Sequence, residues 1–267
     1  MEKKVSIIIP TLNGADYIRD NVKSIQKNVK REDYEILVVD DGSSEEEHNK
    51  LVDVTAELKV PLITNGRNGG YGEACNLGLN ASSQTMYKLF FNNDMTAEND
   101  FITPLIDRIE KTKDCGIVGA KLLYPNGTIQ FAGHMRNPFS PKWFDHQYRG
   151  QDGNFLPANK ARVAMSVTGA CLFVADRVLK EIEEKFGHYG YDPKYPMAFE
   201  DVDLCFKARR LGYQCWYEPA AVLTHIEGGT RGVGQKSIED PRQQESIRQF
   251  WKYWTEEEVD EFSKLGY

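Results

Sequence analysis

The sequence predicts an α/β protein built on a mostly parallel, Rossmann-like sheet that is flanked by helices. In the first hundred residues, short apolar runs alternate with longer amphipathic segments, which is the pattern of repeated βαβ units. The apolar runs are nearly continuous, as expected of strands that are covered on both faces. Polar stretches follow several of these runs. Because open α/β sheets form their ligand crevice at the carboxyl ends of the strands, we expect a binding site there.

Four strands and three helices are expected in the first part of the chain. The first strand stops at Pro10, and the helix after it carries Ile18, Val22 and Ile25 on one face. The strands are expected at residues 5–9, 35–39, 61–64 and 86–91. The helices are expected at residues 17–29, from the turn at 40–44 to about 58, and at 74–79.

The rest of the chain is less regular. Residues 125–158 form a long irregular stretch of the kind that is usually functional or mobile. Helices are expected at residues 101–111, 176–186 and 201–211, and strands at 116–119, 166–174 and 213–217. The tail from Asp240 is charged and helical, with one apolar stripe formed by Ile247, Phe250, Trp251 and Trp254. We expect this stripe to pack on the body of the protein, although a second subunit or a membrane would also suit it.

The composition excludes several classes of protein. Of the 267 residues, 40% are hydrophobic and 27% charged, which argues against disorder, and the net charge of -7 offers no general basic field to nucleic acid. The five cysteines are widely spaced and never form a Cys-x-x-Cys pair, which argues against a disulfide framework or a structural zinc site. No apolar run suits a membrane span or a signal peptide. We therefore expect a cytoplasmic protein, with peripheral contact at the inner face of the cell membrane left open.

Two polar motifs follow strands of the first part. In residues 40–43 (Asp-Asp-Gly-Ser), a carboxylate is able to accept from a pyrimidine or a ribose, whereas the plainer interpretation is that Ser43 or Ser44 is the N-cap of the next helix. In residues 92–94 (Asn-Asn-Asp), Asp94 is a hard oxygen ligand suited to Mg²⁺ or Mn²⁺ on a diphosphate. The alternative for this second motif is an Asx-turn.

Two further motifs lie later in the chain. In residues 199–204 (Phe-Glu-Asp-Val-Asp-Leu), a carboxylate is suited to act as general base toward a hydroxyl, although the helix dipole alone also favours acids there. His225 would complete a metal site as a neutral imidazole, but a lone histidine is more often structural. Arg231, in a glycine-rich segment, would clamp phosphate. No one of the four motifs decides the function by itself.

Taken in order, the motifs resemble those of the family 2 inverting glycosyltransferases. The resemblance covers about residues 5–234 and includes Pro-Thr-Leu-Asn, Asp-Asp-Gly-Ser, Arg-Asn-Gly-Gly and Asn-Asn-Asp after successive strands, then Phe-Glu-Asp-Val-Asp-Leu-Cys and a late histidine. Residues 122–130 (Leu-Leu-Tyr-Pro-Asn-Gly-Thr-Ile-Gln) and 168–171 (Thr-Gly-Ala-Cys) are similar to the branch that builds bacterial surface polysaccharides, which has rhamnosyltransferase-like members.

The resemblance implies a GT-A fold in one domain. Residues 1–239 would form this domain, with a nucleotide-binding half at 1–95 and an acceptor and catalytic half at 96–239, followed by the helical tail at 240–267. It also implies a divalent metal, Mg²⁺ or Mn²⁺, held by Asp94 and His225. The family's Asp-x-Asp element reads Asn-Asn-Asp here, and the missing charge would weaken metal binding in the absence of donor.

The resemblance also implies the roles of individual residues. Asp201 would be the general base, with Glu200 as its neighbour and second candidate. Nucleotide contacts would come from Pro10, Thr11, Leu12, Asn13, Asp41, Arg67, Asn68, Gly69, Asn93 and Arg231. On the acceptor side we expect Trp143, Gly169, Ala170 and Tyr191. The aromatic residues of this group would stack on sugar rings, or they would simply form the core under long loops. A lid over the donor is expected at residues 228–234.

The implied activity is transfer of a sugar, with inversion, from a UDP- or dTDP-linked donor to a hydroxyl of a saccharide, a lipid-linked saccharide or another glycoconjugate. Rhamnose is a candidate for this sugar. A sugar nucleotidyltransferase is the nearest enzymatic alternative, but the loop after the first strand has no lysine or arginine for a triphosphate. A non-catalytic nucleotide-sugar-binding protein would not need Asp94, Asp201 and His225 together.

Overall fold

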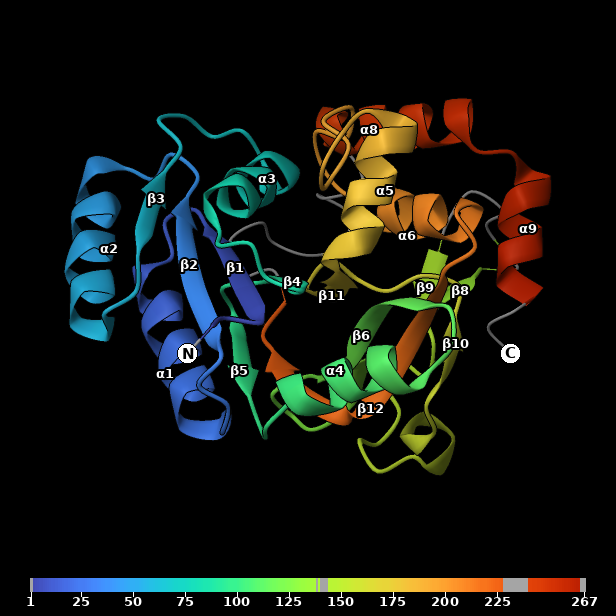
Figure 1. The fold of residues 1–267 in the computed structure, drawn as a ribbon, viewed down its shortest axis with the longest axis horizontal. Coiled ribbons are helices and arrows are strands. Elements are labelled where there is room, and N and C mark those ends of the chain that lie inside the picture. Colours follow the sequence, from blue (N-terminus) through green and yellow to red (C-terminus); the bar gives the residue numbers. More distant parts are fainter. Residues whose placement is uncertain (1, 138, 140–143, 228–239, 265–267) are drawn as a thin grey trace.

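Four parallel strands form one half of the sheet in the computed structural model, which describes residues 2–137, 139, 144–227 and 240–264 (Figure 1). They lie in the order β4 (Tyr87–Phe91), β1 (Val5–Thr11), β2 (Tyr34–Asp40) and β3 (Leu62–Thr64). The helices between them are α1 (Ala15–Asn28), α2 (Glu45–Leu58) and α3 (Tyr71–Ala81). The predicted βαβ pattern is confirmed, and it places the carboxyl ends of these strands at one edge.

The other half of the sheet is mixed. The strands β6 (Cys115–Leu123) and β12 (Gln214–His225) run parallel, while β11 (Cys171–Ala175) lies between β4 and β6 and is antiparallel to both. Three short strands pair at the margins: β5 (Met95–Ala97) and β10 (Arg162–Ala164) with β12, and β7 (Ile129–Phe131) with β6. One sheet therefore runs through both halves, in the order β10-β12-β6-β11-β4-β1-β2-β3.

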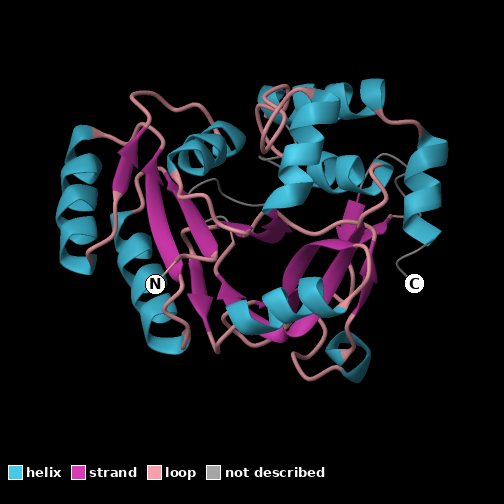
Figure 2. Ribbon diagram, in the orientation of Figure 1, coloured by secondary structure: helices cyan, strands magenta, loops and turns pink. Residues whose placement is uncertain are grey.

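The remaining elements cover this second half. Figure 2 shows α4 (Ile102–Lys111) on one side of the sheet and α5 (Asp176–Phe186) and α6 (Glu200–Arg210) on the other. The strands β8 (His134–Arg136) and β9 (Phe144–His146) form a separate two-stranded ribbon, and Leu156–Asn159 forms a 3₁₀ turn. The C-terminal helices are α8 (Pro241–Tyr253) and α9 (Glu256–Lys264).

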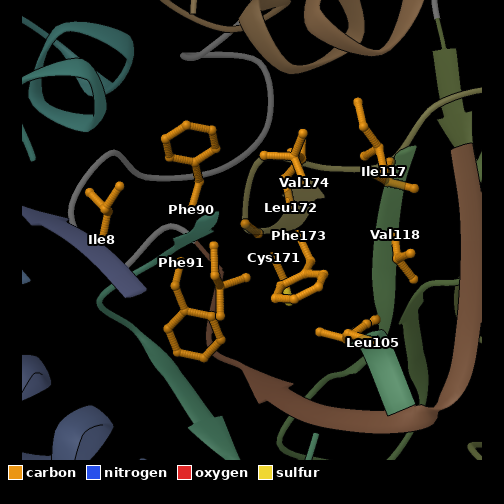
Figure 3. Packing of buried hydrophobic residues seen from close by; sticks show 14 of the residues in the cluster. Ile8, Phe90, Phe91, Leu105, Ile117, Val118, Cys171, Leu172, Phe173 and Val174 are labelled. Atoms are coloured by element: carbon orange, nitrogen blue, oxygen red, sulfur yellow. The ribbon is translucent and has the colours of Figure 1, made fainter. Parts of the chain in front are cut away.

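The core occupies both faces of the sheet. Figure 3 shows Phe90 and Phe91, which are neighbours in β4, pointing to opposite sides of the strand. Both side chains are fully buried, and their rings lie against Tyr191 (4.5 Å between centroids) and Phe101 (5.4 Å) respectively. Full burial of one such side chain contributes roughly 1.5–3 kcal/mol. Because both faces are covered, the strands have the continuous apolar runs from which they were predicted.

Several elements differ from the expected ranges. The strand predicted at residues 166–174 begins only at Cys171, because residues 168–171 form a turn in which the N–H of Cys171 donates to the C=O of Thr168 (3.3 Å). Conversely, β12 continues to His225, well beyond the predicted end at residue 217. The irregular stretch at 125–158 contains β7, β8 and β9 as short strands, each of which is too brief to produce a periodic pattern.

The apolar stripe of the tail packs on the body of the protein, as expected. Phe250 is fully buried, and its ring lies 5.2 Å from that of Phe199 and 5.8 Å from that of Phe206. Trp254 is almost fully buried, and its Nε1–H donates to Oδ1 of Asp203 in α6 (2.9 Å). The tail is therefore attached directly to α6.

Candidate active site

One pocket of about 460 Å³ lies at the carboxyl ends of the strands β1, β2 and β4. Asp41, Asp94, Asp201 and His225 all line it, although they are far apart in the sequence. The same pocket is lined by other expected site residues: Pro10, Thr11, Leu12, Asn68, Asn93, Gly169, Ala170 and Glu200. Its volume is within the usual range for a small-molecule site.

Asp41 holds the turn between β3 and α3. Its Oδ1 accepts hydrogen bonds from the N–H of Gly69 (2.9 Å) and from Nδ2 of Asn65 (2.9 Å), and its Oδ2 accepts from the N–H of Gly70 (2.8 Å). Burial, the largest influence, raises the pKa of Asp41, although these three hydrogen bonds act in the opposite direction. The N-cap interpretation of this motif is confirmed for Ser44, whose side chain accepts from the N–H of Glu47 in the first turn of α2 (3.4 Å), while Asp41 lines the pocket.

The loop after β4 is fixed from two sides. Nδ2 of Asn93 donates to Oγ1 of Thr11 at the end of β1 (2.8 Å). Asn21, which is fully buried in α1, donates from Nδ2 to the C=O groups of Asn92 (2.9 Å) and Met95 (3.0 Å). These bonds satisfy the backbone where the strand ends, and they hold the Asn-Asn-Asp loop at the pocket.

Asp94 and His225 meet in the pocket from neighbouring strands. β5 and β12 pair so that His225 faces Met95, the residue after Asp94. Nε2 of His225 lies 3.0 Å from Oδ1 of Asp94, and both side chains are less than a tenth exposed. Nδ1 of His225 lies 2.7 Å from Oε1 of Gln130. Both ring nitrogens of His225 therefore have a polar neighbour.

This pair suits a divalent cation. The carbonyl oxygen of Gln130 can only accept, so the 2.7 Å contact requires a proton on Nδ1 of His225. In a neutral ring Nε2 is then an acceptor, and it faces the carboxylate of Asp94 across 3.0 Å. A cation bound between Nε2 and the carboxylate would remove the repulsion between these two acceptors. Imidazole together with carboxylate is a set of ligands used for manganese and related ions. The residues thus fit the implied metal.

Asp201 lies at the start of α6 and is held by a tight turn. Its Oδ2 accepts from the N–H of Gly169 (2.7 Å), and the C=O of Gly169 accepts from the O–H of Tyr71 (2.6 Å). A Cβ on residue 169 would lie 3.3 Å from the Cβ of Asp201 and 3.4 Å from the ring of Tyr71. Glycine therefore allows the turn to approach the carboxylate closely enough to donate to it.

The turn before α6 is strained. Ala198 (φ 62°) and Phe199 (φ 70°) are both left-handed, a conformation that costs a non-glycine residue roughly 1–3 kcal/mol. The strained turn places Glu200 and Asp201 in the pocket wall at the amino end of the helix. The partial positive charge of a helix N-terminus favours carboxylates at this position.

The other expected residues lie elsewhere. Arg67 is two-thirds exposed and pairs with Glu73 (2.7 Å), and neither it nor Asn13 nor Gly69 lines the pocket. Tyr191 is fully buried against Phe90 and Tyr71, so its ring is part of the core and is not available for stacking on a sugar. The remaining predictions lie outside the described residues: Trp143, Arg231 and the lid at 228–234.

The sequence assigns no role to several residues that line the pocket, among them Asn92, Gln130, His146, Glu227, Asp240 and Arg242. Gln130 ends the segment 122–130 that supported the resemblance, which is the one signal that could have indicated it. Among the described lining residues there are six carboxylates but only one lysine or arginine, Arg242. A diphosphate bound here therefore needs a cation to offset this negative charge.

A second group with metal-ligand chemistry lies outside the pocket. His188, Asp192 and Asp203 are close enough to hold an ion. However, Nζ of Lys207 lies among them, 2.7 Å from Oδ2 of each aspartate and 2.8 Å from Nε2 of His188. Lys207 is 2% exposed. The cation of this buried cluster is therefore the ammonium group of Lys207.

The sequence comparison with protein families decides the family. Residues 6–173, well over half of the chain, match the model described as "Glycosyl transferase family 2". The chain belongs to this family. This confirms the resemblance drawn from the motifs, and the matched region contains Asp41, Asp94 and the turn at Gly169.

Curated relatives cover most of the chain. This chain is 29% identical, over 93% of its length, to the "Uncharacterized protein y4gI" of Sinorhizobium fredii. It is 27% identical, over 85% of its length, to the "O-antigen biosynthesis protein RfbC" of Myxococcus xanthus. The chain spans only 27% and 18% of these two proteins. It is also 23% identical over 74% of its length to the "N-acetylglucosaminyl-diphospho-decaprenol L-rhamnosyltransferase" of Mycobacterium tuberculosis, of which it spans 68%.

A solved structure shares the fold. The crystal structure of GalNAc-T7 with UDP, GalNAc and Mn²⁺ superimposes with a TM-score of 0.73, over 97% of this chain and 50% of that chain, at 16% identity. The predicted GT-A fold is thereby confirmed. Among the described helices, none is both long enough and apolar enough to span a bilayer.

Proposed function

We propose that this chain transfers a sugar from a UDP- or dTDP-linked donor to a hydroxyl of a saccharide or another glycoconjugate, with inversion of configuration. The observation that carries the proposal is the convergence of Asp201 with the Asp94–His225 pair on one pocket of suitable size. Rhamnose is the first sugar to test, because one curated relative is named as a rhamnosyltransferase and the motifs resemble that branch.

In the proposed reaction, Asp201 removes the proton from the acceptor hydroxyl. The oxygen forms a bond to the anomeric carbon as the bond from that carbon to the diphosphate breaks on the opposite face, which inverts the configuration. Asp201 suits this role because Gly169 holds one carboxylate oxygen in the pocket wall (2.7 Å). Asp94 and His225 would hold Mg²⁺ or Mn²⁺, which supplies positive charge for the leaving diphosphate when it is bound.

The residues at the ends of the first strands would bind the nucleotide. Pro10, Thr11 and Leu12 line the pocket beside Asp41 and Asn68, which follow the next two strands. Gly169 and Ala170 would contact the acceptor near the base. This division corresponds to a nucleotide-binding half at residues 1–95, an acceptor and catalytic half at 96–239, and an attached tail at 240–267.

Release of nucleoside diphosphate tests the proposal. The protein is incubated with a panel of UDP- and dTDP-sugars, with and without saccharide and lipid-linked saccharide acceptors and with and without EDTA. We expect acceptor-dependent release that EDTA suppresses and Mn²⁺ restores. Pyrophosphate release from a nucleoside triphosphate would instead favour a sugar nucleotidyltransferase, and donor binding without turnover would favour a non-catalytic binding protein.

The substitution Asp201→Asn tests the base. We expect the turnover number to fall by roughly 10²- to 10⁴-fold, because general base catalysis contributes about this much, while the affinity for the donor stays within a few-fold. Initial rates and calorimetric donor titration measure the two quantities. Asp53→Asn, on the exposed face of α2, is the matched control and should retain normal rates. Near-normal turnover by Asp201→Asn would exclude Asp201 as the base.

A further inference from the structure

Gln130 lies where the sheet inserts an extra residue. Leu122 and Leu123 are adjacent in β6, but they pair with Phe131 and Ile129 of β7, which are two residues apart. Gln130 is therefore the unpaired residue of a β-bulge. Bulges redirect a side chain and are frequent beside active sites. Here the bulge presents the buried side chain of Gln130 to the pocket, next to His225.

The amide of Gln130 has one orientation because Glu227 fixes it. Nε2 of Gln130 lies 3.2 Å from Oε2 of Glu227, and that carboxylate also accepts from the O–H of Tyr124 (2.8 Å) and from Arg149 (2.9 Å). Because Glu227 accepts from the O–H of Tyr124 and pairs with Arg149, its carboxylate presents an acceptor oxygen to Gln130. The amide of Gln130 therefore turns its donor, Nε2, toward Glu227.

The opposite side of the same amide then decides the tautomer of His225. With Nε2 committed to Glu227, Oε1 of Gln130 faces Nδ1 of His225 at 2.7 Å. This acceptor requires the proton on Nδ1, so in the neutral ring the lone pair is on Nε2, which faces Asp94. Nδ2 of Asn92, a donor, lies 3.3 Å from the same Nε2, which agrees with an acceptor at that atom.

The backbone at Glu227 is strained in this arrangement. Glu227 has a φ of 60°, a left-handed conformation that costs a non-glycine residue roughly 1–3 kcal/mol. Glu227 follows His225 by only two residues, and this backbone conformation allows its side chain to turn back to Gln130. On the other side, Nδ1–H of His146 donates to the C=O of Gln130 (2.9 Å) and anchors its main chain.

From this chain of contacts we propose that Gln130 is a positioning residue, oriented by Glu227, that holds His225 in the Nδ1–H tautomer so that Nε2 is available to a divalent cation beside Asp94. The metal role rests on the proposed function, whereas the tautomer can be tested in the metal-free protein. Partners of this kind typically change metal affinity by about 10- to 100-fold when they are removed.

The first test measures metal binding and the tautomer in Gln130→Leu. Manganese affinity in the presence of UDP or dTDP is obtained from the EPR signal of free Mn²⁺, and we expect it to weaken by about 10- to 100-fold. The ¹⁵N shifts of labelled histidine, with the His225 signals identified by their loss in His225→Asn, report the tautomer without metal. They should show Nδ1–H in the wild type and a substantial Nε2–H population in Gln130→Leu.

A matched control separates this role from general stability. Gln147→Leu removes another buried glutamine, whose Oε1 accepts from Arg162 (2.9 Å) and has no bond to His225. This variant should keep both the manganese affinity and the His225 tautomer of the wild type. Wild-type affinity and an unchanged tautomer in Gln130→Leu would overturn the inference, and so would an equal loss of affinity in Gln147→Leu.

An exchange of the two side chains gives a second test that a merely structural role would not satisfy. Gln130→Glu alone sets two carboxylates against each other and should weaken manganese binding. Adding Glu227→Gln restores one donor and one acceptor, and the affinity should recover to within a few-fold of the wild type. Failure of this rescue would count against the inference. If the wild type shows the Nδ1–H tautomer but neither binds Mn²⁺ nor transfers sugar, the proposed function fails while the tautomer assignment stands.

Discussion

His134 and His146 face each other in the paired strands β8 and β9, with their ring centroids 5.2 Å apart, and His146 lines the pocket. Burial lowers the pKa of both to about 3. Nδ1 of His134 contacts Oγ of Ser166 (2.9 Å), and Nδ1 of His146 contacts the C=O of Gln130 (2.9 Å). The guanidinium group of Arg149, 3.2 Å from Nδ1 of His146, also acts to lower both pKa values. Both rings are therefore neutral in the folded protein at physiological pH.

This burial predicts a dependence of stability on pH. An unfolded histidine has a pKa of about 6.5, so between about pH 6.5 and 3 the unfolded chain binds protons that the folded protein does not. The stabilisation is complete above pH 6.5 and declines as the pH falls, by up to about 1.4 kcal/mol per pH unit for each histidine. His134→Asn should reduce this slope between pH 6 and 5 by about one proton, as measured by urea unfolding. Equal slopes in variant and wild type would show that His134 titrates in the folded protein.

At this scale the sequence predicts acidic and metal-ligating residues but not their partners. Asp94 and His225 could be selected because the order of the motifs resembles that of a known family, although each motif alone also has a structural interpretation. Gln130 and Glu227 could not, because an amide and a carboxylate in a loop gain their role only when β7 and β12 come together. Tyr191 shows the reverse case, since an aromatic residue suits a core and a sugar site equally well.

Among the elements, α3 packs unusually close to the sheet at Gly78. A Cβ on this residue would lie 2.5 Å from Cγ2 of Ile8 in β1 and 2.7 Å from Cγ2 of Val39 in β2. Gly72, in the same helix, has more room, because its Cβ would lie 3.6 Å from the nearest atom, in Tyr191. The close packing of α3 on the sheet therefore requires a glycine at position 78 but not at position 72.

We expect opposite effects from alanine at these two positions. Gly78→Ala should destabilise the protein by about 1–3 kcal/mol, because overpacking outweighs the helix propensity of alanine. Gly72→Ala should be neutral or stabilising by up to about 1 kcal/mol. Urea unfolding of both variants measures the difference. A stable Gly78→Ala variant would show that α3 can move away from β1 and β2.

Strands and helices could be predicted where the pattern is long. The strands of the parallel half have continuous apolar runs, so their positions could be read from the sequence, whereas β5, β7 and β10 have three residues each and no periodicity. The extension of β12 to His225 does not show in the sequence, because Glu218 and Pro219 interrupt the apolar run at the point where the pairing with β6 shifts register. Pairing partners, rather than local preference, set these boundaries.

At the scale of the whole molecule, Lys207 joins three segments. Its ammonium group contacts Asp192 in the loop before α6 and Asp203 within α6, and Asp203 in turn accepts from Trp254 of the tail (2.9 Å). The loop, the helix that carries Asp201, and the C-terminal helices therefore share one buried charge cluster.

We expect Lys207→Met to destabilise the protein by about 3–5 kcal/mol, because it leaves two buried carboxylates without their cation. Lys194→Met is the matched control. Lys194 also approaches Asp192 (3.8 Å), but it is two-thirds exposed, so its loss should change stability by less than about 1 kcal/mol. Thermal and urea unfolding measure both variants. A mild effect of Lys207→Met would mean that Asp192 and Asp203 find other partners or take up protons.

The α/β class and the alternation of strands and helices along the first part of the chain could be predicted from the sequence, but the direction of β11 could not. Its run from Cys171 to Ala175 is apolar throughout, so it would suit a parallel or an antiparallel neighbour equally well. Its direction depends on the connection from residues 125–170, where the sequence shows little periodicity.

This strand restricts how the protein can move. Because β11 is hydrogen-bonded to β4 on one side and to β6 on the other, the parallel half and the mixed half of the sheet form one continuous hydrogen-bonded structure. A hinge rotation of one half against the other would break the hydrogen bonds of β11 and expose Phe90, Leu172 and their neighbours to water. The sheet beneath the pocket therefore stays fixed while substrates enter and leave. Any opening or closing of the pocket must come from segments at its rim.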